Sequence, residues 1–200
     1  MQPRSRKVLL AVATVGVLCL CGCAGDQFVL EHPLPFVVDD RIVGSWAEQD
    51  GKLSEVIRRG DGQSYVALSS DDVVKNGKGS VFYLARAGDA LFAEGEQSCD
   101  QFYFHPPATD KTCWFIVKLN LSGDSLAYQF FDTRLIVRAS LAGQIKDVSL
   151  MYGVSAEKGT NSNFSADVLI EGMPSEVAPF LAKYAAGAVY GATVVQMHRI

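Results

Sequence analysis

The sequence predicts a mainly β protein, an antiparallel sandwich or barrel that carries one helix near its C-terminus. Two patterns lead to this prediction. From Asp39 onward, short segments of alternating apolar and polar residues recur, and Gly, Asn and Asp turn signals separate them. Near the C-terminus, the spacing of apolar residues becomes that of an amphipathic helix. With 48% hydrophobic and 20% charged residues in a chain of 200, neither disorder nor a coiled coil is expected.

Residues 1–22 are predicted to be a lipoprotein signal peptide. Arg4, Arg6 and Lys7 supply a basic start, and an apolar run of 13 residues, Val8–Leu20, follows. A membrane-spanning helix needs about 20 residues, so this run suits a secretory signal better than a transmembrane helix. An ordinary signal peptide that is cut near Ala24 and carries no lipid is the alternative interpretation.

The sequence Leu20-Cys21-Gly22-Cys23 resembles the lipobox of bacterial lipoproteins, in which a small residue precedes the cysteine that is lipidated. The resemblance implies that Cys23 carries the lipid and anchors the protein to a membrane. One acyl chain binds a membrane only marginally, whereas two or more hold it stably. Because residue 24 is Ala rather than Asp, the resemblance also implies the outer membrane of the cell envelope, facing the periplasm or the cell surface.

The mature chain is predicted to divide at residue 39. Residues 23–38 contain two prolines and no clear periodicity, so we interpret them as lipid anchor and tether, and residues 39–200 as the β domain. Signals such as Asp50-Gly51 mark the hairpins. The strands expected in the first part of the domain are Arg41–Glu48, Leu53–Arg59, Ser64–Ser69, Gly79–Arg86, Leu91–Glu96, Cys113–Leu121 and Ser125–Asp132.

Residues 133–163 give a weaker pattern. Leu135–Leu141 fits either a strand or a helical turn, because its apolar residues satisfy both periods. Asp147–Val154 is expected to be a strand and Glu157–Asn163 a loop. Phe164–Ile170 alternates weakly, which favours a further strand.

The helix is predicted at Ser175–Ala186, and the last strand at Ala192–Ile200. Ser175 can cap the start of the helix, and Gly187 can end it. Pro179 lies early in the helix, where a missing N–H does least harm. The apolar stripe at helical spacing consists of Val177, Phe180, Leu181, Tyr184 and Ala185.

Two cysteines, Cys99 and Cys113, remain once the signal is removed and Cys23 is acylated. An exported protein meets a compartment in which disulfides persist. A hairpin centred near residue 106 would set the two cysteines opposite each other, so they are predicted to form a disulfide. The alternative is a redox or metal-binding pair, although Cys-x-x-Cys spacing is absent.

No motif in the sequence identifies an enzyme. His32, His105 and His198 share no helical spacing, and none pairs with a cysteine at metal-ligand spacing, so neither a metal nor a cofactor is expected. Gly-x-Ser-x-Gly and P-loop motifs are absent, which leaves a hydrolase with a triad built from distant residues as a minor alternative. A net charge of -4 argues against a nucleic-acid partner.

Gly44-Ser45-Trp46, in the first predicted strand, resembles the Gly-x-Trp motif of lipocalins and related calycin barrels. The segment Val168–Arg199, a strand, a helix and a last strand, is similar to the C-terminal part of lipocalin-like bacterial lipoproteins. This resemblance implies an up-and-down barrel of about 8–10 strands. The helix precedes the last strand here, whereas in ordinary lipocalins it follows the barrel.

The same resemblance implies how the barrel closes. In lipocalins the tryptophan of this motif lies at the closed end, and an arginine from near the end of the chain packs across its ring. Here those positions are held by Trp46, with Gly44 beside it, and by Arg199. A guanidinium on an indole face contributes about 0.5–2 kcal/mol.

Three functions were weighed. The first is a lipid-anchored binding module whose barrel accepts a small apolar or amphipathic ligand, because the predicted inward faces are rich in aromatic residues such as Phe115, Tyr128 and Phe130. The second is an envelope interaction or inhibitor module with a filled barrel that binds another envelope protein through its surface. The hydrolase is the third. The sequence identifies no ligand-binding residue.

Overall fold

The computed structural model describes residues 28–75, 77–99, 111–155, 163–184 and 190–200. The predicted signal peptide, the predicted lipid attachment at Cys23 and His105 all lie outside these ranges. Within them, no helix is long and apolar enough to span a membrane.

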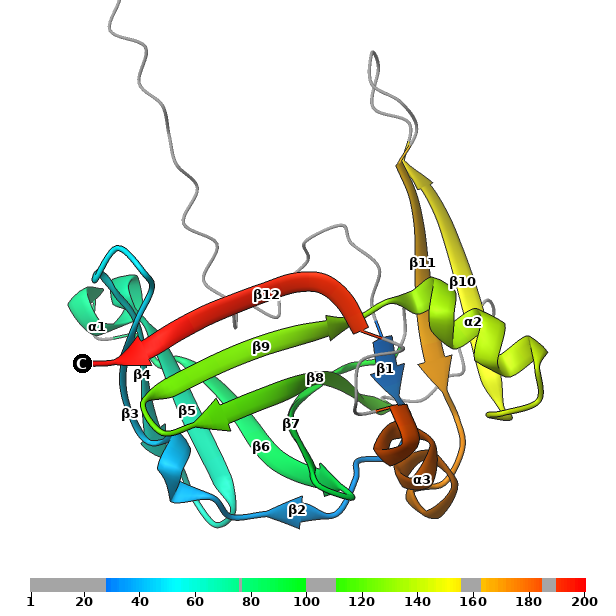
Figure 1. Ribbon diagram of the computed structural model, residues 1–200, viewed down its shortest axis with the longest axis horizontal. Helices are drawn as coiled ribbons and strands as arrows, with labels where there is room; N and C mark the ends of the chain where they lie inside the picture. Colours follow the sequence, from blue (N-terminus) through cyan, green and yellow to red (C-terminus); the bar gives the residue numbers. More distant parts are fainter. Residues whose placement is uncertain (1–27, 76, 100–110, 156–162, 185–189) are drawn as a thin grey trace, which may run out of the picture.

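Eight antiparallel strands form a closed barrel (Figure 1). Neighbours in the ring are also neighbours in the chain, except that the last strand pairs with β9 on one side and with β3 on the other and so closes the ring. The predicted antiparallel barrel is therefore confirmed. Its strands are β3 (Gly44–Ala47), β4 (Leu53–Arg59), β5 (Ser64–Ser69), β6 (Ser80–Ala87), β7 (Ala90–Ser98), β8 (Thr112–Ser122), β9 (Ser125–Phe131) and β12 (Tyr190–Arg199).

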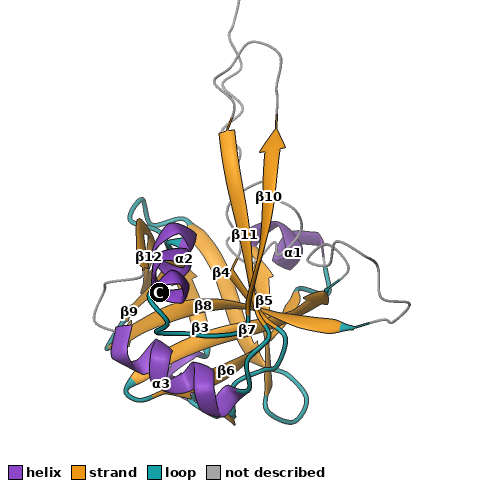
Figure 2. Cartoon of the chain, turned by 90° about the vertical axis from the view of Figure 1, so that its right-hand side faces the viewer, coloured by secondary structure: helices purple, strands orange, loops and turns teal. Residues whose placement is uncertain are grey.

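Strand β8 pairs with both β9 and β1, at different parts of its length. Its C-terminal half pairs with β9 inside the barrel, whereas Trp114 and Phe115 pair with the short strand β1 (Phe28–Leu30). Beyond β1 lie β11 (Asn163–Ile170) and β10 (Val148–Ser155), and β1 runs parallel to β11. Figure 2 shows β10 and β11 projecting away from the barrel. Both strands were expected from the sequence.

The tether prediction for residues 23–38 is wrong for residues 28–38, which are part of the fold. All three residues of β1 are buried, because they fill the sheet between β8 and β11. Residues Phe36–Val37 form β2, which pairs with β6, and the Phe36 ring stacks on Tyr83 at a centroid distance of 4.4 Å. The folded part of the chain thus begins at least ten residues before the predicted boundary.

The segment between β1 and β2 crosses the outer face of β7 and buries a glutamate there. Glu94 has an exposed fraction of 0%. The backbone N–H of Leu34 donates to both oxygens of its carboxyl group, at 3.3 and 3.2 Å. Burial raises the pKa of Glu94 to about 8, against the opposing effect of the Leu34 hydrogen bond.

Three α-helices occur among the described residues, where one was predicted. The predicted one is α3 (Pro174–Tyr184), whose buried side is formed by Val177, Phe180 and Leu181. The ambiguous segment near residue 135 is helical: α2 (Thr133–Leu141) starts at Asp132, whose side chain accepts the Arg134 N–H at 3.0 Å. Helix α1 (Ser70–Lys75) was not foreseen.

Two apolar cores share the wall of the barrel. The interior core lies inside the barrel. Its largest members, Trp46, Tyr65, Phe82 and Tyr128, are almost completely buried. The exterior core lies between the outer face of β6–β8 and the covering elements β1, β11, α2 and α3 (Figure 2). Strands β6–β8 are consequently apolar on both faces, which is typical of a buried strand.

The predicted pairing of Cys99 with Cys113 is present as a disulfide, with Cα atoms 5.0 Å apart. Both cysteines are completely buried and pack with Val29 of β1 and Leu169 of β11. The bond ties the end of β7 to the start of β8 at the point where the sheet leaves the barrel.

The double variant Cys99→Ser/Cys113→Ser is expected to lose up to about 3 kcal/mol of unfolding free energy and still to fold. A sequence separation of 14 closes a loop for which chain entropy predicts about this amount. Urea unfolding of the oxidised protein, the reduced protein and the double variant measures the effect. If reduction left the urea midpoint of the wild-type protein unchanged, the prediction would be refuted.

Candidate functional site

The closed end of the barrel brings together Gly44, Trp46 and Arg199. Arg199 and Trp46 are direct partners across β12 and β3, and the guanidinium carbon of Arg199 lies 4.5 Å from the centroid of the indole ring. This distance is within the limit of about 6 Å for a cation–π contact. The same guanidinium donates to the backbone oxygens of Val43, at 2.7 Å, and Arg41.

Gly44 is the residue that this arrangement requires. A Cβ atom at this position would lie 2.4 Å from Nη1 of Arg199, and the backbone has a φ of +156°, which favours glycine. The Trp46 indole N–H donates to the Ile42 oxygen at 2.9 Å, and Ile42 belongs to the 3-10 helix η1 (Asp40–Ile42) that covers this end. The three residues therefore act in barrel closure and leave no room for a ligand at the ring.

Removing the guanidinium and the indole separately should give non-additive losses of stability. We expect the variants Arg199→Ala and Trp46→Phe to show a coupling energy above about 0.5 kcal/mol in a double-mutant cycle, because Arg199→Ala removes and Trp46→Phe weakens the same contact. Urea unfolding of the four proteins measures this energy. Arg58→Ala, an exposed arginine of β4, combined with Trp46→Phe should be additive and serves as the control.

A polar pair lies inside the barrel next to this closed end. The Tyr128 hydroxyl donates to Oε2 of Glu55 at 2.7 Å, and the residues are 0% and 4% exposed. Burial raises the pKa of Glu55 to about 7, while the hydrogen bond from Tyr128 acts in the opposite direction. Burial, together with the Glu55 charge, raises the pKa of Tyr128 well above its usual value. The pair places a hydroxyl group and a carboxyl group among the apolar side chains of the interior core.

Beyond this pair, the interior is lined differently. Phe115, Phe130 and Val195 pack on the interior core, yet all three are partly exposed to solvent. The ring centroids of Phe115 and Phe130 are 6.4 Å apart. On the neighbouring strand β7, the small residues Gly95 and Ala93 pair with Phe115 and Val117. We call this region, with Gln97, the open half of the interior.

Gln97 adds a polar group to the open half. Its amide nitrogen Nε2 is buried and has no hydrogen-bond partner among the described residues. An unsatisfied buried N–H group costs about 1–3 kcal/mol, which a polar atom of a ligand would recover. The residue continues the row of β7 side chains that includes Ala93 and Gly95, since side chains two apart share a face.

The sequence carried a signal for Glu55 that we did not use. Glu55 shares a strand face with Leu53 and Ile57, so alternation places it on the apolar side of β4. Of the aromatic residues predicted to face inward, Phe115, Tyr128 and Phe130 all contact the interior core. Within the described residues, no group of three His, Cys, Asp or Glu side chains could hold a metal ion.

Comparison of the chain with protein-family models, with curated proteins and with solved structures found no match. The architecture supplies the remaining information. A closed antiparallel barrel of eight strands is consistent with a lipocalin-like fold. It departs from the ordinary arrangement in the extension β1-β11-β10 and in the position of α3, which comes before the last barrel strand.

Proposed function

We propose that this protein is a lipid-anchored envelope lipoprotein whose barrel binds a small apolar or amphipathic ligand in the open half of the interior. The observation that supports the proposal is the exposure of Phe115 and Phe130. Both rings point into the barrel and contact its core, but solvent still reaches them. Inward aromatic rings that touch solvent are typical of a binding cavity rather than of a filled core.

The two halves of the interior differ in a way that favours this location. Around Trp46 the barrel is filled by large side chains of almost zero exposure. In the open half, the wall formed by β7 carries only Ala93 and Gly95 opposite Val117 and Phe115. A ligand there would rest on the polar pair Glu55–Tyr128.

The side chains of the open half and of the polar pair determine which kind of ligand fits. Apolar rings and small side chains suit an apolar body, and Tyr128, Glu55 and Gln97 suit one uncharged polar group that both donates and accepts hydrogen bonds. An anionic group is disfavoured, because it would be held next to a carboxyl group in a low dielectric. We therefore expect a neutral molecule, such as one with a hydroxyl or amide group.

Lipid attachment at Cys23 would place this barrel at a membrane. Cys23 is only five residues before β1, so the barrel would lie close to the bilayer that holds the lipid. Hydrophobic molecules that leave or enter a membrane are the natural ligands of a barrel in this position. The outer membrane is the location that Ala24 favours.

Native mass spectrometry tests the function. Protein purified from the envelope should carry a reproducible excess mass beyond its lipid, and a Cys23→Ser form made in the cytoplasm should not. Val195→Trp fills the open half from β12 and should remove the bound mass, whereas Gln196→Trp, its exposed neighbour on the outer face, should not. A bare envelope protein that co-purifies with one other protein would instead favour the interaction module.

A further inference from the structure

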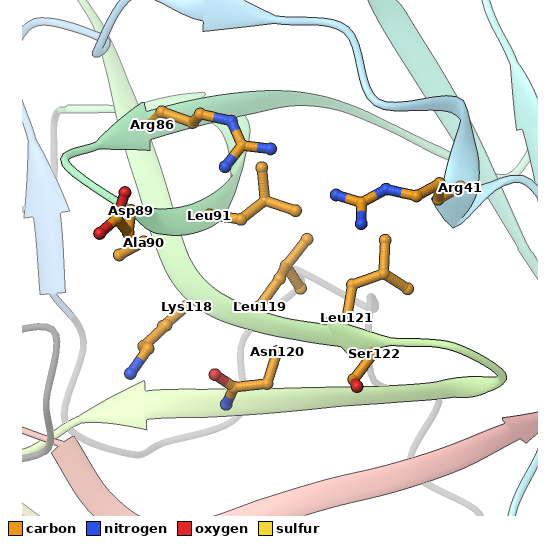
Figure 3. A pocket seen from close by; sticks show the side chains of 10 residues that line it. All are labelled: Arg41, Arg86, Asp89, Ala90, Leu91, Lys118, Leu119, Asn120, Leu121 and Ser122. Carbon is orange, nitrogen blue, oxygen red and sulfur yellow. The ribbon is translucent and has the colours of Figure 1, made fainter.

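We propose a second binding site, at the closed end of the barrel, for an amphipathic anion: a carboxylate or phosphate head that carries an alkyl chain. The site is a cleft of about 430 Å³ between η1, the β6–β7 turn and β8. This volume falls within the range of about 300–1,000 Å³ that is usual for small-molecule sites. Figure 3 shows the cleft, which we call the arginine cleft.

Two arginines lie opposite each other across this cleft. Arg41 comes from η1 and Arg86 from the end of β6, and their guanidinium groups point toward one another (Figure 3). Between and below them are the side chains of Leu91, Leu119 and Leu121. Leu91 and Leu119 are direct partners across β7 and β8, so they form one continuous apolar floor. The cleft therefore combines a cationic rim with an apolar base.

The position of the two guanidinium groups is fixed by one buried carboxylate. Oδ2 of Asp39 lies 2.5 Å from Nη2 of Arg41 and 3.1 Å from Nη2 of Arg86. The Asp39 side chain is 8% exposed, whereas the two arginines are 67% and 40% exposed. The hydrogen bond from Arg41 chiefly holds the pKa of Asp39 below its usual value, so this carboxylate remains charged.

Arg41 and Arg86 are the cationic side chains that project into the cleft, and Asp89 also lines it. The Lys118 side chain points away from both arginines (Figure 3). Among the described residues, Nε and Nη1 of Arg86 have no hydrogen-bond partner, and Arg groups present such donors in a geometry that matches carboxylate and phosphate.

The leucine floor distinguishes this site from a simple anion site. Leu91 and Leu119 are almost completely buried, whereas Leu121 is partly exposed. A free phosphate would bind the rim alone, whereas an alkyl chain would also cover the exposed part of Leu121. The site is independent of the open half, which lies at the other end of the barrel and favours an uncharged group. Failure of one proposal therefore leaves the other standing.

Isothermal titration calorimetry with octyl phosphate, below its micellar concentration, tests the proposal. Arg86→Gln should weaken binding about tenfold or more, because a charge-assisted hydrogen bond is lost. Arg58→Gln, on the outer face of β4, should change nothing, and neither should Val195→Trp. Near-ultraviolet circular dichroism verifies that each variant is folded.

Inorganic phosphate is the second probe, and it should bind at least about tenfold more weakly than octyl phosphate, because it cannot use the floor. Leu121→Ser should reduce this difference. The third measurement is binding of the protein to phosphatidylglycerol vesicles. Vesicle binding that Arg86→Gln abolishes identifies a lipid headgroup as the source of the anion, whereas binding of the free amphiphile alone identifies a diffusible molecule.

Two results would overturn the proposal. One is an octyl phosphate affinity that is the same in wild type and in Arg86→Gln. The other is equal affinity for octyl phosphate and inorganic phosphate, since the apolar floor would then contribute nothing.

Discussion

Raising the pH from about 5 to about 9 is expected to lower the unfolding free energy of this protein by several kcal/mol. The cause is two buried glutamates, for which the described part of the chain provides no buried cationic partner. Glu94 lies under the segment that joins β1 to β2, and Glu55 lies inside the barrel. Burial raises the pKa of Glu94 to about 8 and that of Glu55 to about 7, from 4.5 in each case.

The direction follows from proton linkage. Between pH 4.5 and the raised pKa, the folded protein holds a proton that the unfolded chain has released, so stability falls as the pH rises. Below pH 4.5 both states are protonated, and the full stability is present. The carboxyl groups of Asp39 and Asp132, whose pKa values are lowered mainly by hydrogen bonds from Arg41 and Arg134, act oppositely and lose their contribution in more acidic solution. We therefore expect greatest stability between about pH 4 and pH 5.

One pKa unit corresponds to about 1.4 kcal/mol, so the upper limits are about 5 kcal/mol for Glu94 and about 3 kcal/mol for Glu55. Urea unfolding at a series of pH values measures how steeply the unfolding free energy changes with pH. In the Glu94→Gln variant, the unfolding free energy should fall less steeply above pH 7. Glu96→Gln, an exposed residue two positions further along the same face of β7, should keep the wild-type slope. A wild-type stability that rises between pH 5 and pH 8 would contradict the assignment.

Replacing Trp46 by Ala should cost about 3–5 kcal/mol, which is the usual range for a buried aromatic residue. Trp46 is completely buried, its indole N–H is satisfied by Ile42, and its face is covered by Arg199. Truncation leaves a cavity at the seam where β3 meets β12 and exposes the guanidinium to an empty space. The loss of free energy should appear mainly as an earlier urea midpoint, measured by far-ultraviolet circular dichroism.

The control for this variant is Trp46→Phe, which keeps an aromatic ring at the seam. It removes the indole N–H and part of the volume, so its loss should be clearly smaller than that of Trp46→Ala. If the two variants lost the same amount, the hydrogen bond to Ile42 rather than the packing of the ring would hold the closed end together. A loss below about 1 kcal/mol for Trp46→Ala would mean that the ring is not part of the core.

The barrel could be predicted because each of its strands and turns is specified by a short stretch of neighbouring residues. Each strand from β4 to β9 alternates on its own, and each hairpin carries its own turn residues, such as Gly123 with a φ of +55° between β8 and β9. The disulfide followed from the hairpin that joins β7 to β8. Helix α1 also had a local signal that we did not use: Ser69 and Asp72 bond reciprocally, at 3.2 Å in each direction between side chain and backbone, as in a capping box.

The features that the sequence could not show depend on distant partners. Phe28–Leu30 is too short to show an alternating pattern, and the two prolines that follow it are equally typical of a linker. The segment is a strand because it pairs with β8 and β11. Glu94 has the pattern of a solvent-facing residue on β7, and it is buried because residues near Leu34 cross over it. Arg41 and Arg86 are 45 residues apart, and the shared carboxylate of Asp39 brings them to one cleft.

The pairing of β1 with β11 and of β3 with β12 sets an order of events during folding. Phe28 aligns with Val168, and Trp46 with Arg199, so strands β1 and β3 gain their second partners only when the end of the chain is present. Contacts of such long sequence separation require large loops to close and slow the approach to the native state. The meander β4–β8 can form beforehand, because each strand pairs with the next. Until its last residues are present, the chain would thus carry a partly formed sheet with open edges, and open strand edges are prone to aggregation.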